Sequence, residues 1–231
     1  MTNRKIDYWV IPPQADAEFV ASMENVLDTY AKPYDPTLPV VCMDEQPIQL
    51  LKETRLSMPA TKQHAQRIDY EYERAGTASI FMFAAPLSGW RSVRVLPQRT
   101  KVDWAREVAG LLTTRYATAA KLLLVCDNLN THTRGAFYEA FEPTSAREHV
   151  RRLEFCYTPK HGSWLHIAEN ELSAMTRQCV AHRRFGDIAT LQRETSAWAK
   201  DVNQKQKAVD WQFTIANART KLRSVYPKIK F

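Results

Sequence analysis

Apolar and polar residues follow two different periods along this chain, and each period predicts a different element. Over residues 14–34 the large apolar side chains recur at helical spacing, and Pro33 is expected to end that helix. Residues 40–45, VVCMDE, are apolar and then acidic, which is typical of a short strand. The chain therefore opens with a predicted helix, a linker and a predicted strand.

The next segment alternates with a period of two, which favours strands. Residues 67–74 and 91–97 alternate between polar and apolar positions, and residues 78–86 are almost wholly apolar. We interpret AGT (75–77) and SGW (88–90) as turns between them. The pattern predicts an antiparallel meander.

The rest of the chain returns to mostly helical spacing. The continuous apolar run in KLLLVCDN, residues 121–128, is typical of a central strand covered on both faces. Thr131 and Thr144 are plausible N-caps for two helices after it. The expected order is a helix over 101–117, the strand over 121–128, helices over 131–141 and 143–153, a strand over 154–159, and helices over 163–180, 191–206 and 215–226. This order predicts a mixed α/β sheet with helices on both faces.

Composition adds a class and a compartment to this picture. The net charge of +7 suits a polyanionic partner, although a merely basic protein is the equal alternative. We interpret the four cysteines as buried, reduced thiols of a cytoplasmic protein. No apolar run approaches the ~18 residues of a membrane helix, and residues 1–10 lack the apolar core of a signal peptide, so no membrane partner is expected.

Acidic residues follow two of the predicted strands, at Asp44 and Asp127. If those strands are neighbours, the two carboxylates meet at one end of the sheet, where ligand sites in such sheets gather. Close carboxylates repel each other, and Mg²⁺ or Mn²⁺ relieves that repulsion. Glu169 or Glu171 on the following helix could supply a third ligand, and helical spacing does not choose between them. The alternative is structural, because Asp often ends a strand simply by favouring a turn.

Three segments carry a resemblance to a known family: VVCMDEQPIQLL, LLLVCDNLNTH and YTPKHGSWLHIAENELSAMTRQC. They resemble the catalytic domain of IS630-type transposases, within the Tc1/mariner-like group of DDE transposases, and the likeness spans nearly the whole chain. The resemblance implies an RNase H-like fold of the retroviral integrase type, with a five-stranded mixed sheet. It implies an N-terminal helix and linker over 1–36 and a catalytic domain over 37–231.

The resemblance also implies which acids bind metal. Asp44, Asp127 and Glu169 match the three carboxylates that hold two Mg²⁺ or Mn²⁺ ions, which leaves Glu171 as an acid beside the site. His166 stands where the family usually has Asn. This change either alters substrate contact or metal occupancy, or is a tolerated surface change.

Other polar residues of these motifs have two possible roles each. Glu45, Asn128, Asn130 and His132 could orient the metal ligands or contact DNA, and the alternative for Asn130 and Thr131 is to cap the next helix. Lys160 and His161 could meet a scissile phosphate or lie in solvent. Tryptophans 104, 164 and 211 are expected in the core, and arginines 151, 152, 183 and 184 are expected either at the DNA backbone or on a solvated helix face.

The function implied by the resemblance is cut-and-paste DNA transposition. Water would attack a phosphodiester at the element end, and the freed 3′-hydroxyl would attack a TA target in double-stranded DNA. A homodimer is expected in the DNA complex, nucleoid-associated in a bacterium. Because the chain starts about forty residues before Asp44, we expect it to lack the family's helix-turn-helix modules, as an isolated catalytic domain, a second reading frame or a decayed copy.

Two alternatives remain from the sequence. A truncated, inactive transposase could bind DNA or full-length protomers as an inhibitor, and a host RNase H-like nuclease would cleave without strand transfer. An ATP-driven regulator is disfavoured, since the sequence has no GxxxxGK[ST] phosphate loop.

Overall fold

The computed structural model describes residues 11–228 except positions 13, 56, 66, 68 and 206. Residues 1–10 of the expected N-terminal segment lie outside the described residues. The helices are α1 (Ala17–Ala31), α2 (Lys101–Thr113), α3 (Arg134–Ala140), α4 (Pro143–Arg151), α5 (Ile167–Met175), α6 (Ile188–Gln204) and α7 (Ile215–Lys221). The strands are β1 (Val40–Glu53), β2 (Tyr72–Ala85), β3 (Trp90–Leu96), β4 (Leu122–Cys126) and β5 (Leu153–Tyr157).

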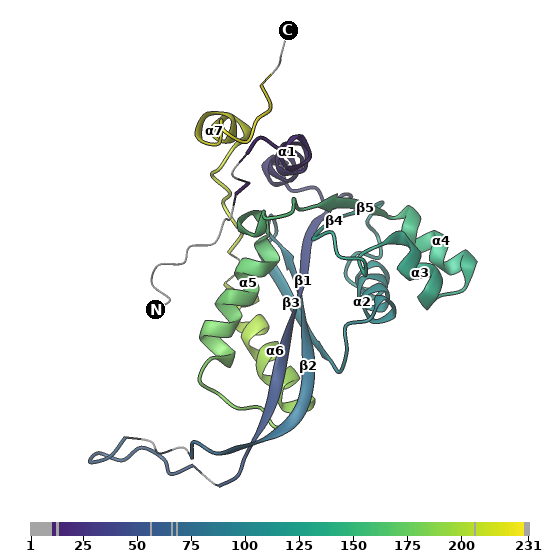
Figure 1. The fold of residues 1–231 in the computed structure, drawn as a ribbon. Coiled ribbons are helices and arrows are strands. Elements are labelled where there is room, and N and C mark those ends of the chain that lie inside the picture. Colours follow the sequence, from purple (N-terminus) through teal and green to yellow (C-terminus); the bar gives the residue numbers. More distant parts are fainter. Residues whose placement is uncertain are drawn as a thin grey trace.

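The strands form one five-stranded mixed sheet in the order β3-β2-β1-β4-β5 (Figure 1). The first three strands pair antiparallel, and β4 and β5 continue the sheet parallel to β1. β3 and β4 run in the same direction on either side of β2 and β1, so the chain needs a crossover between them, which α2 supplies. The predicted fold, a mixed five-stranded sheet with helices on both faces, is confirmed.

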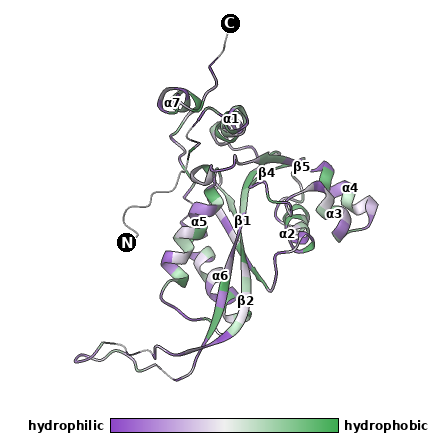
Figure 2. Cartoon of the chain, viewed as in Figure 1, coloured by the Kyte–Doolittle hydropathy of each residue, from purple (hydrophilic) through white to green (hydrophobic). Residues whose placement is uncertain are grey.

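Alternation along the central strands assigns each face to a different helix group. On β1, Val40 and Cys42 pack with α1, α5 and α6, whereas Val41 and Met43 pack with α2, α3 and α4. In Figure 2 β4 is uniformly hydrophobic, while α5 carries both colours, as expected for a strand covered on both faces and for an amphipathic helix. The predicted central strand at 121–128 is therefore confirmed, over Leu122–Cys126.

The predicted turn at 75–77 is wrong. β2 runs straight through these residues, and the register shifts between Gln49 and Leu51, so that β2 carries one extra residue there. Gly76, with φ 95°, absorbs that residue as a β-bulge. The predicted strand over 67–74 shrinks correspondingly to Tyr72 onward, and position 68 of that strand lies outside the described residues.

The predicted N-caps Thr131 and Thr144 are also wrong. α3 has Thr133 as its N-cap, because residues 130–133 are used in a turn that carries a side chain into the core. α4 starts one residue before Thr144, at Pro143, whose fixed φ suits the first helical position.

The single helix predicted over 163–180 is divided into three pieces. A 3₁₀ turn, η2 (Ser163–Leu165), is followed by His166 in an extended conformation, then by α5, and then by the π-helical η3 (Thr176–Val180). The break makes His166 the N-cap of α5 and places Glu169 in the first turn of that helix.

Several smaller predictions concern burial. All four cysteines are free and buried, as predicted, and Trp104 is fully buried. Arg152 is neither solvated nor available to DNA, because its guanidinium donates to main-chain oxygens of Leu112, Tyr116 and Ala119. Within the described residues, no helix is both long and apolar enough to span a bilayer.

Candidate active site

The register of β1 against β4 brings Asp44 and Asp127 together. The short strand predicted over 40–45 is wrong in length, because β1 continues to Glu53 in its pairing with β2, so Asp44 lies within β1 and only Asp127 follows a strand end. Cys42 lies opposite Val125 in this parallel pair, and continuing the same register by two residues sets Asp44 opposite Asp127. Side chains two residues apart on a strand point to the same face. Asp44 and Asp127 therefore share the face of Cys42 and Val125, which pack in the core against α1, α5 and α6. Glu45 takes the opposite face of β1, as the alternation of a strand requires.

Helix α5 carries two acids, Glu169 and Glu171, and only one of them lies beside Asp44 and Asp127. Glu169 lines the same pocket as Asp44 and Asp127. Glu171 does not line that pocket. It forms an ion pair with Arg91, whose Nη2 lies 2.7 Å from Glu171 Oε1 and whose side chain is 7% exposed. Helical spacing did not choose between Glu169 and Glu171. The structure places Glu169, and not Glu171, in the pocket with Asp44 and Asp127.

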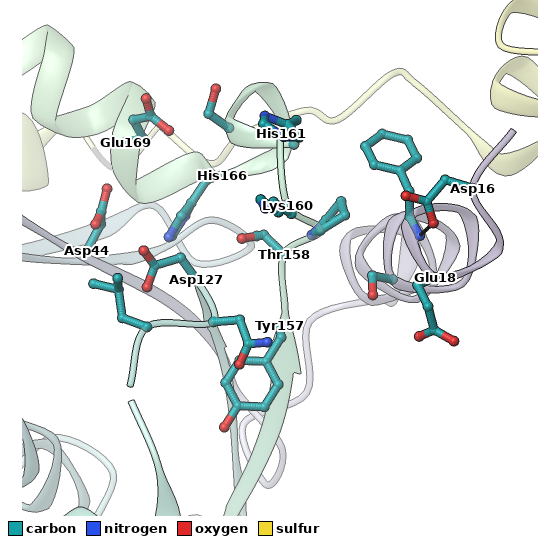
Figure 3. A pocket seen from close by; sticks show the side chains of 17 residues that line it. Asp16, Glu18, Asp44, Asp127, Tyr157, Thr158, Lys160, His161, His166 and Glu169 are labelled. Carbon is teal, nitrogen blue, oxygen red and sulfur yellow. Dashed lines mark hydrogen bonds between the residues drawn. The ribbon is translucent and has the colours of Figure 1, made fainter. Parts of the chain in front are cut away.

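The three acids line an open pocket of about 710 Å³ beside the carboxyl end of β4 (Figure 3). Its opposite wall is the loop after β5, which carries Lys160 and His161. Asn128 lines the pocket as predicted, whereas Asn130 is exposed and does not. Lys160 and His161 therefore lie in the same pocket as the acids.

Sequence reasoning missed the part of the wall that comes from α1. Asp16 and Glu18 line the far side of the pocket, and Asp16 caps α1 by accepting from the main-chain N–H of Phe19 at 3.0 Å. The capping pattern predicts the start of a helix, but it does not indicate which distant strand that start will face. Thr158, just after β5, was missed for the same reason.

Burial and neighbouring charge make Asp44 hard to ionise. Burial raises the pKa of Asp44, and the carboxylates of Asp127, Glu45 and Glu169 raise it further, to about 7. The main-chain N–H of Glu45 donates to Asp44 Oδ1 at 2.8 Å and opposes that rise. Burial and Asp127 also raise the pKa of Glu169. The pocket therefore concentrates negative charge that a cation would stabilise.

Asp127 is held from behind by a buried histidine. His132 is fully buried, and its Nδ1 lies 2.7 Å from Asp127 Oδ1 and 3.2 Å from the Asp127 main-chain oxygen. The N–H is aligned with the main-chain oxygen, so the contact with Oδ1 is a close charge contact rather than a well-formed hydrogen bond. Burial would raise the pKa of Asp127, but His132 outweighs it and holds the pKa below its ordinary value.

The other ring nitrogen of His132 binds Glu45. Nε2 lies 3.0 and 3.1 Å from the two carboxylate oxygens of Glu45, whose side chain is 3% exposed. The imidazole also stacks on Trp104, with ring centroids 5.2 Å apart. Burial alone would lower the pKa of His132, but Asp127, Cys126 and Glu45 together raise it to about 12. His132 is therefore an internal cation that orients Asp127, and neither it nor Glu45 is exposed for contact with DNA.

His166 occupies the space between the acids. It is 3% exposed, and its imidazole points from the start of α5 toward the space between Asp44 and Asp127 (Figure 3). Burial lowers its pKa to about 4, so the ring is neutral at pH 7. The sequence alternative of a tolerated surface position is wrong, because the break before α5 turns this side chain inward.

The donors of this pocket suit a hard divalent cation. Carboxylate oxygens are the ligands that Mg²⁺ and Mn²⁺ prefer, and Asp44, Asp127 and Glu169 supply them from three separate elements. Among the described residues, no three His, Cys, Asp or Glu side chains already stand at the spacing of a closed metal site. The residues fit such an ion in chemistry and location, and their side chains would have to turn inward to enclose it.

The order of the sheet and the three acids that line the pocket are features of a known family of enzymes. Residues 39–192 match the family described as DDE superfamily endonuclease, which is more than half of the chain. This chain therefore belongs to the DDE superfamily endonucleases, and the resemblance to DDE enzymes noted in the sequence is confirmed. No curated protein matches the chain.

Solved structures of the Mos1 mariner transposase share the fold. A pre-cleavage Mos1 transpososome aligns with a TM-score of 0.57 and 13% identity, over 99% of this chain and 68% of the Mos1 chain. A Mos1 mariner paired end complex with Mn aligns with a TM-score of 0.53 and 13% identity, over 87% of this chain. In that second alignment this chain spans only 60% of the Mos1 chain. At such identity the likeness establishes the RNase H-like fold alone.

The first prediction concerns the charge on Asp44. In metal-free buffer with EDTA at pH 8, Asp44→Asn should raise the melting temperature by at least about 2–4 °C, because it removes a destabilising buried charge and each kcal/mol is worth about 2–4 °C in a chain of this size. With a folded pKa near 7 against an ordinary 3.8, the folded state holds a proton that the unfolded state loses, so stability falls as pH rises from about 4 to about 7.

Differential scanning calorimetry at pH 5 and pH 8 checks this sign, since the gain should be smaller at pH 5. Glu139→Gln, at an exposed carboxylate on α3, serves as the control and should change the melting temperature little at either pH. A lower melting temperature for Asp44→Asn at pH 8 would contradict the account.

The second prediction concerns the ion pair behind Asp127. His132→Phe keeps a ring against Trp104 but leaves Glu45 buried without its partner, so the free energy of unfolding should fall by about 3–5 kcal/mol at pH 7. Adding Glu45→Gln should restore part of that loss, because the stranded charge is then removed. Urea unfolding of both single variants and the double variant measures this coupling, and strictly additive effects would refute it.

Proposed function

We propose that this chain is the catalytic domain of an IS630-like cut-and-paste transposase, which cleaves DNA at element ends and transfers the freed strand. The observation that carries the proposal is the meeting of Asp44, Asp127 and Glu169 in one pocket of a DDE superfamily endonuclease. The titles of the Mos1 structures, which name paired-end and strand-transfer complexes, support DNA as the substrate.

The proposed roles follow from where each acid lies. Asp44, Asp127 and Glu169 would together hold two Mg²⁺ or Mn²⁺ ions, because all three line the same pocket. Bound ions of this kind deprotonate water or a 3′-hydroxyl and stabilise the leaving oxygen. Mos1 structures titled with Mn and with Mg support this choice of cofactor.

The remaining pocket residues would position the substrate and the ligands. His132 fixes the orientation of Asp127 from behind, and the Tyr157 hydroxyl, which donates to the His132 main-chain oxygen at 2.8 Å, fixes His132 in turn. Lys160 and His161 are exposed on the opposite wall, where they would bind a phosphate next to the scissile bond.

Three finer parts of the proposal have their support in the family resemblance. Element ends would be paired by a homodimer, the target would be a TA dinucleotide, and sequence-specific binding of the ends would require helix-turn-helix modules. The net charge of +7 supports association with the polyanionic backbone of DNA.

The third prediction tests the chemistry. The purified chain should nick supercoiled plasmid in the presence of Mn²⁺ or Mg²⁺ and should join a duplex with a pre-cleaved 3′ end to target DNA. Asp127→Asn and Glu169→Gln should each reduce nicking by at least about 100-fold, because even the partners of metal ligands are worth about 10- to 100-fold.

Glu139→Gln, an exposed carboxylate on α3, is the matched control and should nick as the unaltered chain does. Full activity of Asp127→Asn would refute the assignment of the acids. DNA binding without nicking in Mn²⁺ would instead support the inhibitor alternative, and nicking without joined product would support a nuclease without strand transfer.

A further inference from the structure

His166 is a buried polar side chain whose two ring nitrogens have no hydrogen-bond partner among the described residues. The Met43 backbone lies close enough to influence its pKa, but neither nitrogen makes a contact with hydrogen-bond geometry. Buried polar atoms are nearly always paired, and leaving them unpaired destabilises the fold. The unpaired ring nitrogens of His166 therefore indicate that a ligand binds to this side chain.

The surrounding chain holds this imidazole rigidly against the acids. His166 sits between Leu165 and Ile167, both fully packed in the core, and its own N–H donates to the Ser163 main-chain oxygen at 2.8 Å. The Leu165 carbonyl accepts from the buried Tyr30 hydroxyl at 2.9 Å. The ring therefore cannot swing out to solvent without unpacking the start of α5.

Its direction identifies the missing partner. Figure 3 shows the imidazole directed between the carboxylates of Asp44 and Asp127, and all three residues line the pocket together with Glu169. His132 lies 2.7 Å from Asp127 and shares its charge between Asp127 and Glu45, and no ion pair joins Asp127 to His166 in the described part of the chain. A neutral ring at this position presents a nitrogen lone pair to whatever the carboxylates bind.

We propose that His166 supplies a nitrogen ligand to the divalent ion held by Asp44 and Asp127, and that this ligand makes the site prefer Mn²⁺ over Mg²⁺. The proposal rests on the proposed function, because it assumes that these acids bind metal. Imidazole suits transition metals, whereas Mg²⁺ binds carboxylate and water oxygens and gains little from nitrogen. A mixed nitrogen and oxygen set therefore shifts selectivity without removing the carboxylate ligands.

The fourth prediction reads the metal ligands directly. In the full chain loaded with Mn²⁺, pulsed electron paramagnetic resonance should detect coupling of the metal to an imidazole ¹⁴N. His166→Asn should abolish that coupling, and His161→Asn, at an exposed histidine of the same pocket wall, should leave it intact. Coupling that survives His166→Asn, or that never appears in the unaltered chain, overturns the proposal.

Calorimetric titration supplies the second readout. His166→Asn should weaken Mn²⁺ binding by about 10-fold or more while changing Mg²⁺ binding by much less, so the ratio of the two affinities falls. An unchanged ratio overturns the nitrogen ligand. The melting temperature of each variant without metal reports whether the variant is folded, so that a weakened site is not confused with an unfolded one.

The same titration distinguishes a failure of the His166 proposal from a failure of the proposed metal site. If Asp127→Asn loses Mn²⁺ binding but the unaltered chain shows no nitrogen coupling, the acids bind metal through oxygen alone and only the role of His166 fails. If Asp127→Asn binds Mn²⁺ as tightly as the unaltered chain does, the proposed metal site itself fails.

Discussion

The parallel pairing of β1 with β4 is the constraint on which the rest of the site depends. Its register, continued by two residues, sets Asp44 opposite Asp127 on one face, at the place where β4 ends beside β1. Burial of Asp44 raises its pKa most, and the nearby carboxylate of Asp127 raises it further. The other charged groups nearby are arranged around that repulsion.

The five acids that β1, α5 and the end of β4 place near one another fall into two groups. Glu45 and Glu171 are matched within the fold, by His132 and Arg91 respectively, so their charges are internal and structural. Asp44, Asp127 and Glu169 face the pocket, with only part of their charge compensated. This separation explains how one chain can hold five acids near one sheet edge, and it makes the uncompensated set the natural place for an exogenous cation.

The sequence predicted the sheet and the acids Asp44 and Asp127 because both follow from local patterns. A continuous apolar run predicts a central strand such as β4, and a following Asp127 marks its end. What it could not predict depends on contacts between distant segments. The bulge at Gly76 follows from pairing with β1, and the choice of Glu169 over Glu171 depends on Arg91, which lies on β3. The break at His166 was hidden because apolar spacing continues on both sides of it.

The most direct test of the metal site is a crystal of the chain grown with Mn²⁺ and measured at the manganese absorption edge. We expect an anomalous peak within bonding distance of carboxylate oxygens from both Asp44 and Asp127, where β4 ends beside β1. A peak elsewhere, or none at a saturating Mn²⁺ concentration, would contradict it.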